Sequence, residues 1–409
     1  SSMSYEELEL DASSMSTKLD INVVELDPGI YQEDAVSREA GIWPELRRAE
    51  SRRFAVKMMR SLNETNAFAN VTVTTSSNFL SDIVISGQIQ ESNGEDVRLL
   101  INAVDSTGKS IIKNKVYSHR TNEYFYQNLR NKDKDPFDPI YRAIAADIIK
   151  ELKKRNLEEI ELVTDLRFAQ KLNDMQFYDA LDYENDRYSL GFVPAMDDPM
   201  FLRAQNVQIK DAQFRNEMQK HYVSFSDTMD ESYKIWQEAA LKASKQKREA
   251  QRAAAGKALL GALIVAAAAS SASDSDYYDY NVGATVAATV GAGLLVSAVG
   301  DAQEAKVHES TINEVSKSFD GEIAPQVIEM EGLQVKLEGN IQNQFDQWQT
   351  ILADIYKSES ILTATETTQN NSQTGSSTLQ MLGLSGMGNT NISLIDKVLS
   401  EKEKEILTL

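Results

Sequence analysis

The sequence predicts an α+β protein, and three features support this prediction. Between Leu19 and Arg155, short runs of alternating apolar residues are separated by turn signals and flanked by helical patterns. Beyond Arg155 the patterns are mostly helical. Two apolar, small-residue segments, residues 253–269 and 283–299, then flank a polar turn. Together these features predict an amino-terminal strand-helix-meander-helix domain, followed by long helices and a small-residue apolar helical hairpin.

The elements of the first domain follow from its periodicity. Residues 19–26 alternate and end at a Pro-Gly turn, which predicts a strand. Pro44 stands at a first helical position, and the apolar residues after it, up to Leu62, have the spacing of one buried helix face. A short strand is expected from Val71, and a final helix should carry Ile144 on its buried side. A β-meander is expected between them, over residues 83–89, 97–104 and 111–117.

The second half is expected to be dominated by one long helix. Residues 162–188 look helical, and a much longer helix should begin at Asp198-Pro199 and run to Arg252. Its large apolar residues recur with an eleven-residue period, which predicts a nearly straight or slightly right-handed coiled-coil seam instead of a left-handed supercoil. Residues 301–319 should be helical, residues 323–337 a β-hairpin and residues 340–358 an amphipathic helix. The seam residues are Phe214, Met218, Tyr222, Phe225, Met229, Tyr233, Trp236 and Ala240.

These elements suggest six segments along the chain. They are a flexible leader (1–18), an α+β docking domain (19–155), a helical domain with the rod helix (156–252), the apolar hairpin (253–299), a return helix with a small β-hairpin and an amphipathic helix (300–358), and a polar tail with a short terminal helix (359–409). A lipidated cysteine directly before Ser1 is compatible with the polar start of the chain.

Composition limits the chemistry that this protein can perform. The formal charge is -20 and basic residues form one short stretch only, so nucleic acid is not an expected partner. There is no cysteine, and His119, His221 and His308 lack the spacing of metal ligands. Gly108-Lys109-Ser110 resembles part of a phosphate-binding loop, but it joins two predicted strands and lacks the upstream glycine. No catalytic residue, metal or cofactor is therefore expected, and the chain is not expected to be an enzyme.

The apolar hairpin is the most informative feature of the sequence. Each arm has about 17 residues, so as a helix it would be roughly 25 Å long, at the short limit for crossing a bilayer. Small residues recur four apart, which allows two helix backbones to approach closely. Tyr277, Tyr278 and Tyr280 in the turn would form an interfacial belt. The expected membrane or oligomer interface consists of Ala254, Ala258, Gly261, Ala262, Ala266, Gly283, Ala287, Gly291 and Gly293.

Other interpretations of this region stay open at the level of sequence. The arms could instead form an alanine-rich pair buried inside a protein or oligomer, or a flexible low-complexity loop. Lys257 argues against insertion, although near a helix end its stem can reach the headgroups. The basic stretch before the first arm could contact lipid headgroups or form a solvated helix face. The candidate headgroup contacts are Lys247, Arg248, Arg252 and Lys257.

Two family resemblances add to this interpretation. The strand at residues 81–89, which follows a long helix, resembles the amino-terminal domain of TolB, the lipoprotein activators of penicillin-binding proteins and the curli-secretion lipoprotein. In those families the domain is a docking and ring-forming module. The hairpin, through Gly256, Gly261, Gly283, Gly291 and Gly293, resembles the glycine-zipper segments of outer-membrane lipoproteins.

The resulting expectation is a bacterial envelope protein that assembles into a ring. Its hairpins would insert in the outer membrane, on the periplasmic side, as part of a pore, export or secretion-associated complex. Its partners would be further copies of itself, membrane lipid and other envelope or secretion components. The alternative is a periplasmic scaffold or activator lipoprotein that the hairpin anchors without forming a channel.

Overall fold

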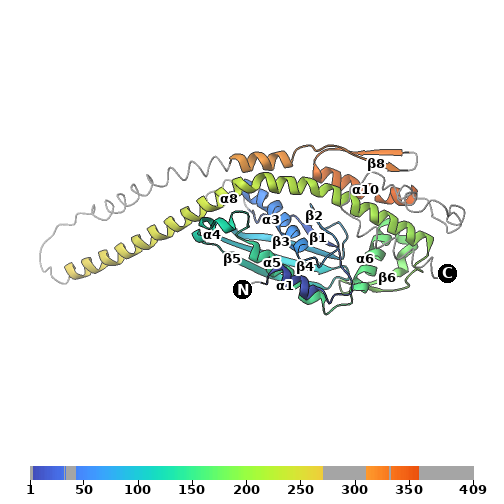
Figure 1. The fold of residues 1–409 in the computed structure, drawn as a ribbon, viewed down its shortest axis with the longest axis horizontal. Coiled ribbons are helices and arrows are strands. Elements are labelled where there is room, and N and C mark those ends of the chain that lie inside the picture. Colours follow the sequence, from blue (N-terminus) through green and yellow to red (C-terminus); the bar gives the residue numbers. More distant parts are fainter. Residues whose placement is uncertain (1–2, 32, 34–42, 270–309, 331–332, 359–409) are drawn as a thin grey trace.

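An α+β body and one very long helix make up the protein in its computed structural model (Figure 1). The structure describes residues 3–31, 33, 43–269, 310–330 and 333–358. For residues 243, 244, 247, 250, 251, 253–269, 330 and 333 it describes the backbone but not the side chains. The predicted α+β class is confirmed: a mixed sheet near the amino terminus is followed by helices.

The five-stranded sheet combines parallel and antiparallel pairs. Its strand order is β2-β1-β3-β4-β5, in which β1 is parallel to both neighbours and β3, β4 and β5 form the predicted antiparallel meander. Gly94 and Gly108 occupy the two meander turns with positive φ. The strands are β1 (Ile21–Val24), β2 (Val71–Thr74), β3 (Ile83–Ser92), β4 (Asp96–Asp105) and β5 (Ser110–Arg120).

Helices α3 (Pro44–Glu64) and α5 (Asp138–Leu152) contact each other and pack on the sheet. Pro44 begins α3, as predicted. Along β4 the side chains of Leu99 and Ile101 are buried whereas Arg98 is exposed, so this strand has one covered face and one more open face. Strands β1 and β2 are instead buried along almost their whole length.

The expectation of a flexible leader over residues 1–18 is wrong for the residues that the structure describes. Helix α1 (Tyr5–Ala12) packs against α5, and its Leu8 is fully buried. Ser4 and Glu7 form a capping box at its start. The hydroxyl of Tyr5 donates to the carboxylate of Asp138 at the start of α5. A capped helix with one buried leucine is stabilised by the tertiary contact, which the short polar sequence does not reveal.

The helix expected over residues 162–188 is also corrected. Helix α6 (Leu157–Leu172) ends before Asn173, and after short turns the chain forms the hairpin of β6 (Leu181–Glu184) and β7 (Arg187–Leu190). Asn185 and Asp186 at its tip both have positive φ. Two such residues form the kind of two-residue turn that a hairpin requires, and this signal outweighs the helical pattern. The short turns are α7 (Asp174–Phe177) and η2 (Tyr178–Ala180).

Helix α8 (Pro199–Ala269) has 71 residues, which corresponds to roughly 105 Å. It begins at Pro199 as predicted but continues through the first apolar arm. The predicted seam is buried from Phe214 to Tyr233, against α3, β2 and the segments that return after residue 310. One continuous hydrophobic core joins the sheet, α3 and α8, so the boundary expected near residue 155 falls inside a single packed unit.

The return segment packs on α8. Residues 310–319 are helical, and the predicted hairpin is present as β8 (Gln326–Met330) and β9 (Leu333–Leu337). Helix α10 (Ile341–Ser358), also predicted, lies along α8, where Trp348 stacks on Phe214 with ring centres 4.6 Å apart. The indole N–H of Trp348 donates to Asp211 at 2.8 Å. The remaining short elements are α4 (Glu123–Gln127) and η1 (Leu129–Asn131).

Candidate functional site: the attachment of the long helix

The site residues expected from sequence fall into two groups in the structure. Ala254, Ala258, Gly261, Ala262 and Ala266 belong to α8, but their side chains lie outside the described part. The second arm and the turn lie outside the described residues as well. This group consists of Gly283, Ala287, Gly291, Gly293, Tyr277, Tyr278 and Tyr280.

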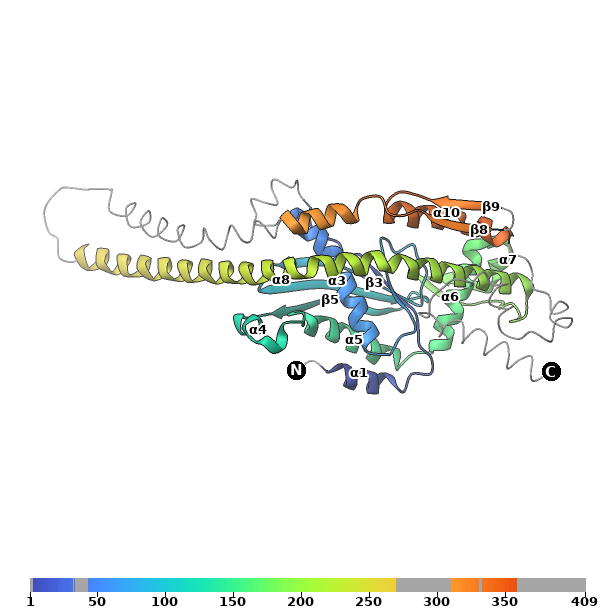
Figure 2. The same cartoon turned by 45° about the horizontal axis from the view of Figure 1, so that its top comes forward.

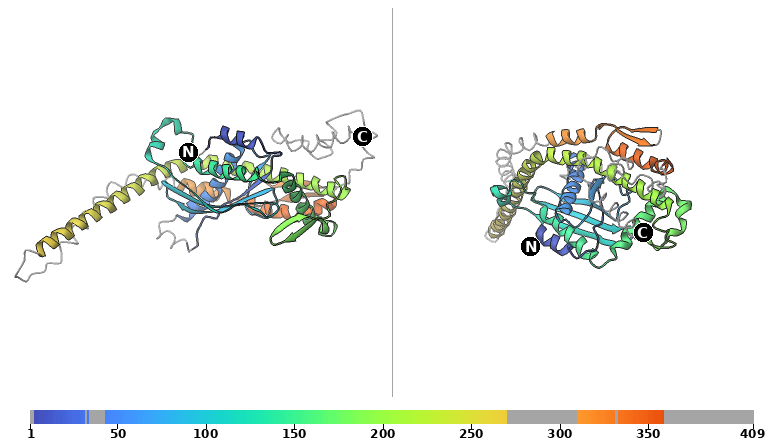
Figure 3. Two further views of the ribbon diagram at one scale, coloured as in Figure 1. Left: turned by 90° about the horizontal axis from the view of Figure 1, so that it is seen from below. Right: turned by 45° about the vertical axis from the view of Figure 1, so that its right-hand side comes forward.

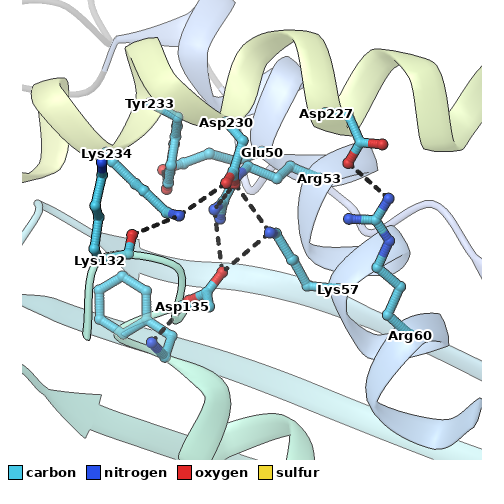
Figure 4. A network of polar contacts seen from close by, with 11 residues as sticks. Glu50, Arg53, Lys57, Arg60, Lys132, Asp135, Asp227, Asp230, Tyr233 and Lys234 are labelled. Atoms are coloured by element: carbon cyan, nitrogen blue, oxygen red, sulfur yellow. Dashed lines mark hydrogen bonds and ion pairs between the residues drawn. The ribbon is translucent and has the colours of Figure 1, made fainter. Parts of the chain in front are cut away.

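A cluster of four charged residues, of which one is fully buried and three are half-buried, attaches the middle of α8 to the body (Figure 4). The guanidinium of Arg53 on α3 is fully buried and bonds Asp230 of α8 at 2.8 Å and Asp135, before α5, at 3.1 Å. Lys57, one turn further along α3, lies 2.9 Å from the same carboxylate of Asp230. Arg53 also lies over the ring of Tyr233, 4.0 Å from its centre. Three elements therefore meet at one ion-pair cluster, formed by Arg53, Lys57, Asp135 and Asp230.

The charges within this cluster set the ionisation of its members. Burial alone would raise the pKa of Asp230, but the adjacent cations of Arg53 and Lys57 hold it well below its usual range. Burial lowers the pKa of Lys57, and the like charge of Arg53 adds to this effect. Because a buried guanidinium without its carboxylates is unfavourable, the cluster specifies where along α3 the helix α8 docks.

Glu50, one turn before Arg53, makes a second buried attachment. Its carboxylate accepts hydrogen bonds from the hydroxyls of Tyr233 on α8 and Ser92 on β3, both at 2.6 Å. Arg47 lies 3.6 Å from its other oxygen. Burial raises the pKa of Glu50, against the effect of Arg47. A single carboxylate thus joins α3, α8 and the sheet.

A third attachment involves Glu25, just after β1. Its carboxylate accepts from the hydroxyl of Tyr222 on α8 at 2.7 Å and lies 3.3 Å from Arg52. Arg52 also pairs with Asp320 and lies 4.5 Å from the ring centre of Phe319. This attachment includes the return segment, so α8 is held between the body and the chain that comes back from the hairpin region.

Two residues of the basic stretch of α8 form ion pairs within the molecule. Arg248 makes a two-pronged ion pair with Glu95 in the β3–β4 turn, at 2.5 and 2.8 Å, and Lys245 pairs with Glu123 of α4 at 2.8 Å. The largely buried carboxylate of Glu95 thus gives Arg248 a charged partner within the molecule, and the expected headgroup contact of Arg248 stays a prediction. Arg252 is exposed. The side chains of Lys247 and Lys257 lie outside the described part.

Helix α8 leaves the body just after these pairs. Figures 1 and 2 show the helix continuing in one direction beyond α4 and the sheet, and the same projection is seen from below in Figure 3. From residue 249 to Ala269 it extends roughly 32 Å. The projection therefore coincides with the change from charged to small apolar residues that begins at Ala253.

Sequence reasoning did not identify the attachment residues. Glu50, Arg53 and Lys57 are spaced three and four apart on α3, so they share a helix row, which is a usable signal. Such a row is more often a solvated face than a buried one. Their partners Asp230 and Tyr233 lie more than 170 residues away in the chain, and no local pattern connects them.

The described residues contain no cluster of His, Asp and Glu that could hold a metal ion. His119 is half-buried beside Phe137, with ring centres 6.3 Å apart, and burial lowers its pKa. Among the helices that the structure describes, none has both the length and the apolar character needed to cross a membrane. No family model, curated protein or solved structure matches this chain.

Proposed function

We propose that this protein is a ring-forming component of a bacterial cell envelope whose α+β body carries an apolar helical hairpin to the outer membrane. The observation that supports the proposal best is the path of α8. The helix is fastened to the body as far as Arg248 and continues as an unbroken helix into the small-residue arm. A rigid connection of this kind fixes the direction in which an apolar segment leaves its domain.

The attachments along α8 would fix the orientation of its projecting end relative to the body. Glu25, the ion-pair cluster and Glu50 hold α8 at Tyr222, Asp230 and Tyr233, which lie 26, 18 and 15 residues before the last pair at Arg248. A helix held at several points transmits the orientation of the body to its projecting end. In a ring, identical bodies would then present identical arms to a common centre.

Assembly is a necessary part of this proposal. Two short helices cannot enclose a water-filled channel, so a pore requires the arms of several copies. Residues spaced four apart, such as Ala254, Ala258 and Ala262, would allow close helix contacts between or within copies. In the alternative function the same hairpin only anchors a scaffold or activator, and the protein needs no ring.

Liposome flotation tests membrane insertion. The full chain should float with vesicles of phosphatidylethanolamine and phosphatidylglycerol, and a variant lacking residues 253–299 should stay in the dense fraction. Circular dichroism of the shortened variant should show that the body keeps its fold, because the attachments up to Arg248 are retained. Flotation of both forms to the same extent would contradict a membrane role for the hairpin.

Particle size in detergent separates the two functions. A closed ring of several copies supports the assembly, whereas a monomer or dimer supports the anchored scaffold. Gly291→Leu should reduce the size of the ring because it adds bulk on the expected contact face, and Leu294→Ala is the matched control on the same arm. Equal effects of the two substitutions would argue against a small-residue interface.

A further inference from the structure

A cavity of about 740 Å³ lies at the end of the body remote from the projecting arm. Two helices contribute to its lining: α6 provides residues spaced three and four apart, and α10 does the same. The β2–β3 loop and Tyr188 of β7 complete the wall. The lining residues are Ser76, Asn78, Leu80, Arg167, Gln170, Lys171, Asp174, Tyr188, Asp346, Gln349 and Thr350.

Two cations one helical turn apart line this cavity. The guanidinium of Arg167 donates to the backbone carbonyl of Ser106 at 2.8 Å and lies 4.3 Å from the ring centre of Tyr188. The ammonium of Lys171 donates to the neutral side chain of Gln349. Within the described part of the chain, neither cation forms an ion pair with an acid. This is notable in a chain with 62 acidic and 42 basic residues.

Arg167 is half-buried and Lys171 is exposed, and they differ in their partners from two buried arginines of the protein. Arg53 and Arg215, each less than 10% exposed, both have aspartate partners within 3.1 Å. Burial lowers the pKa of Lys171, the charge of Asp211 opposes this effect and that of Arg215 adds to it. A bound oxyanion would accept from both cations and would give each a direct charged partner.

We propose that this cavity binds a small solute through one carboxylate or phosphate group held between Arg167 and Lys171. The neutral hydrogen-bonding groups of Ser76, Asn78 and Thr350 line the same space and suit the hydroxyl or amide groups of such a solute.

The acids of the lining restrict the ligand further. Asp346 accepts from Gln342 at 2.9 and 3.0 Å, and Asp174 lies at the start of α7. These carboxylates would repel a polyanion and attract a donor such as an amine or hydroxyl. The chemistry of the cavity therefore fits a solute with a single oxyanion group and several donors, and not a nucleic acid or an anionic membrane surface.

Calorimetric titration of the full chain tests this proposal. The probes are inorganic phosphate and N-acetylalanine, which offers a carboxylate without an amine, with chloride keeping the ionic strength constant. At least one probe should bind saturably, and the stronger probe identifies phosphate or carboxylate as the preferred group. Binding should weaken as the pH rises through the pKa of Lys171, because the deprotonated amine no longer attracts an anion.

Two variants and a control make the test specific. Lys171→Gln can keep the contact to Gln349 while it removes the charge, and it should weaken binding at least tenfold. Arg167→Gln should also weaken binding at least tenfold. Thermal unfolding of this variant checks that it stays folded without the hydrogen bond from Arg167 to the carbonyl of Ser106. Lys357→Gln on α10, outside the cavity lining, is the matched control and should bind as the wild type does. The proposal is overturned if neither probe binds saturably, or if folded Lys171→Gln binds both as tightly as the wild type.

Discussion

The side chain of Gln219 on α8 pairs with the backbone of Val73 on β2 in both directions. Its carbonyl accepts from the N–H of Val73 at 2.8 Å, and its amide donates to the carbonyl of Val73 at 2.9 Å. Because β2 is an edge strand, these groups would otherwise lack a ladder partner. One glutamine thus closes the sheet edge and fixes the register of α8 against it.

Gln219→Ala should lower the free energy of unfolding by about 1–3 kcal/mol, since it leaves a backbone donor and acceptor of β2 without partners. Gln219→Glu should also destabilise the protein, because a carboxylate cannot donate to the carbonyl of Val73. Urea unfolding measures both effects. Gln342→Ala, which removes an exposed glutamine of α10, should change the stability by less than about 0.5 kcal/mol. A loss no larger than that of this control would show that the edge contact contributes little.

The buried pair of Arg53 and Asp230 can be compared with an exposed pair on the same two helices. Asp230→Ala should destabilise the protein by about 3 kcal/mol or more, because it leaves a fully buried guanidinium short of one carboxylate. Asp227→Ala, which breaks the exposed pair with Arg60 at 2.7 Å, should lower stability by less than about 1 kcal/mol.

A double-mutant cycle separates the pair itself from the loss of packing. Arg53→Met with Asp230→Ala should destabilise the protein by less than the sum of the two single substitutions, with a coupling of about 1–3 kcal/mol. The measurement is chemical unfolding of the four proteins in the same buffer. Additive effects would mean that the two side chains contribute independently.

Gly94 allows the β3–β4 turn to approach α8. A Cβ atom there would lie 2.6 Å from the Cβ of Ala240 and 2.8 Å from the carbonyl oxygen of Gln237, and φ is +85°. Gly94→Ala should therefore lower stability by on the order of 1–3 kcal/mol. Adding Ala240→Gly should restore part of the loss, because it relieves the side-chain contact but not the backbone strain. Thermal unfolding of the three proteins tests this, and an unchanged melting temperature of Gly94→Ala would contradict it.

Asp82 should make stability depend on pH. Its carboxylate accepts from the Thr164 hydroxyl on α6 at 2.6 Å and from the N–H of Asp20 at 2.8 Å. Burial, with the nearby charge of Asp20, raises the pKa of Asp82 from 3.8 to about 8. Because the folded pKa is the higher one, the stabilising effect of this group is fully present below about pH 4 and is lost as the pH rises toward 8.

The measurable consequence is a difference between two proteins. Asp82→Asn stays neutral: its Oδ1 can accept from the N–H of Asp20 and its Nδ2 can donate to the hydroxyl of Thr164, which can still donate to the carbonyl of Ile160. Its stability relative to the wild type should therefore rise by on the order of a few kcal/mol between pH 5 and pH 8. The pKa values of Glu50, His119 and His221 are also shifted, but these residues are the same in both proteins, so the difference isolates Asp82. Unfolding in urea at several pH values measures it. Parallel pH profiles would show that Asp82 is already ionised in the folded protein.

Much of the fold follows from local patterns in the sequence. The meander strands, helix α3 with its first-turn proline, the β8–β9 hairpin and α10 were all predicted, since periods of 2 and 3.6 residues belong to a single element. Two predictions were wrong for different reasons. The positive φ of Asn185 and Asp186 forms a hairpin turn where a helix was expected. The burial of Leu8 in the core stabilises a helix where a flexible leader was expected.

The sequence by itself determined that a long helix with an inward seam would lead into a small-residue arm. Only the tertiary structure decided what covers that seam and where the helix leaves the body. Glu50 meets Tyr233 across 183 residues, and Arg248 meets Glu95 across 153. In a chain with so many charged residues, a local pattern cannot specify which of them meet, because each pair depends on how distant elements pack together.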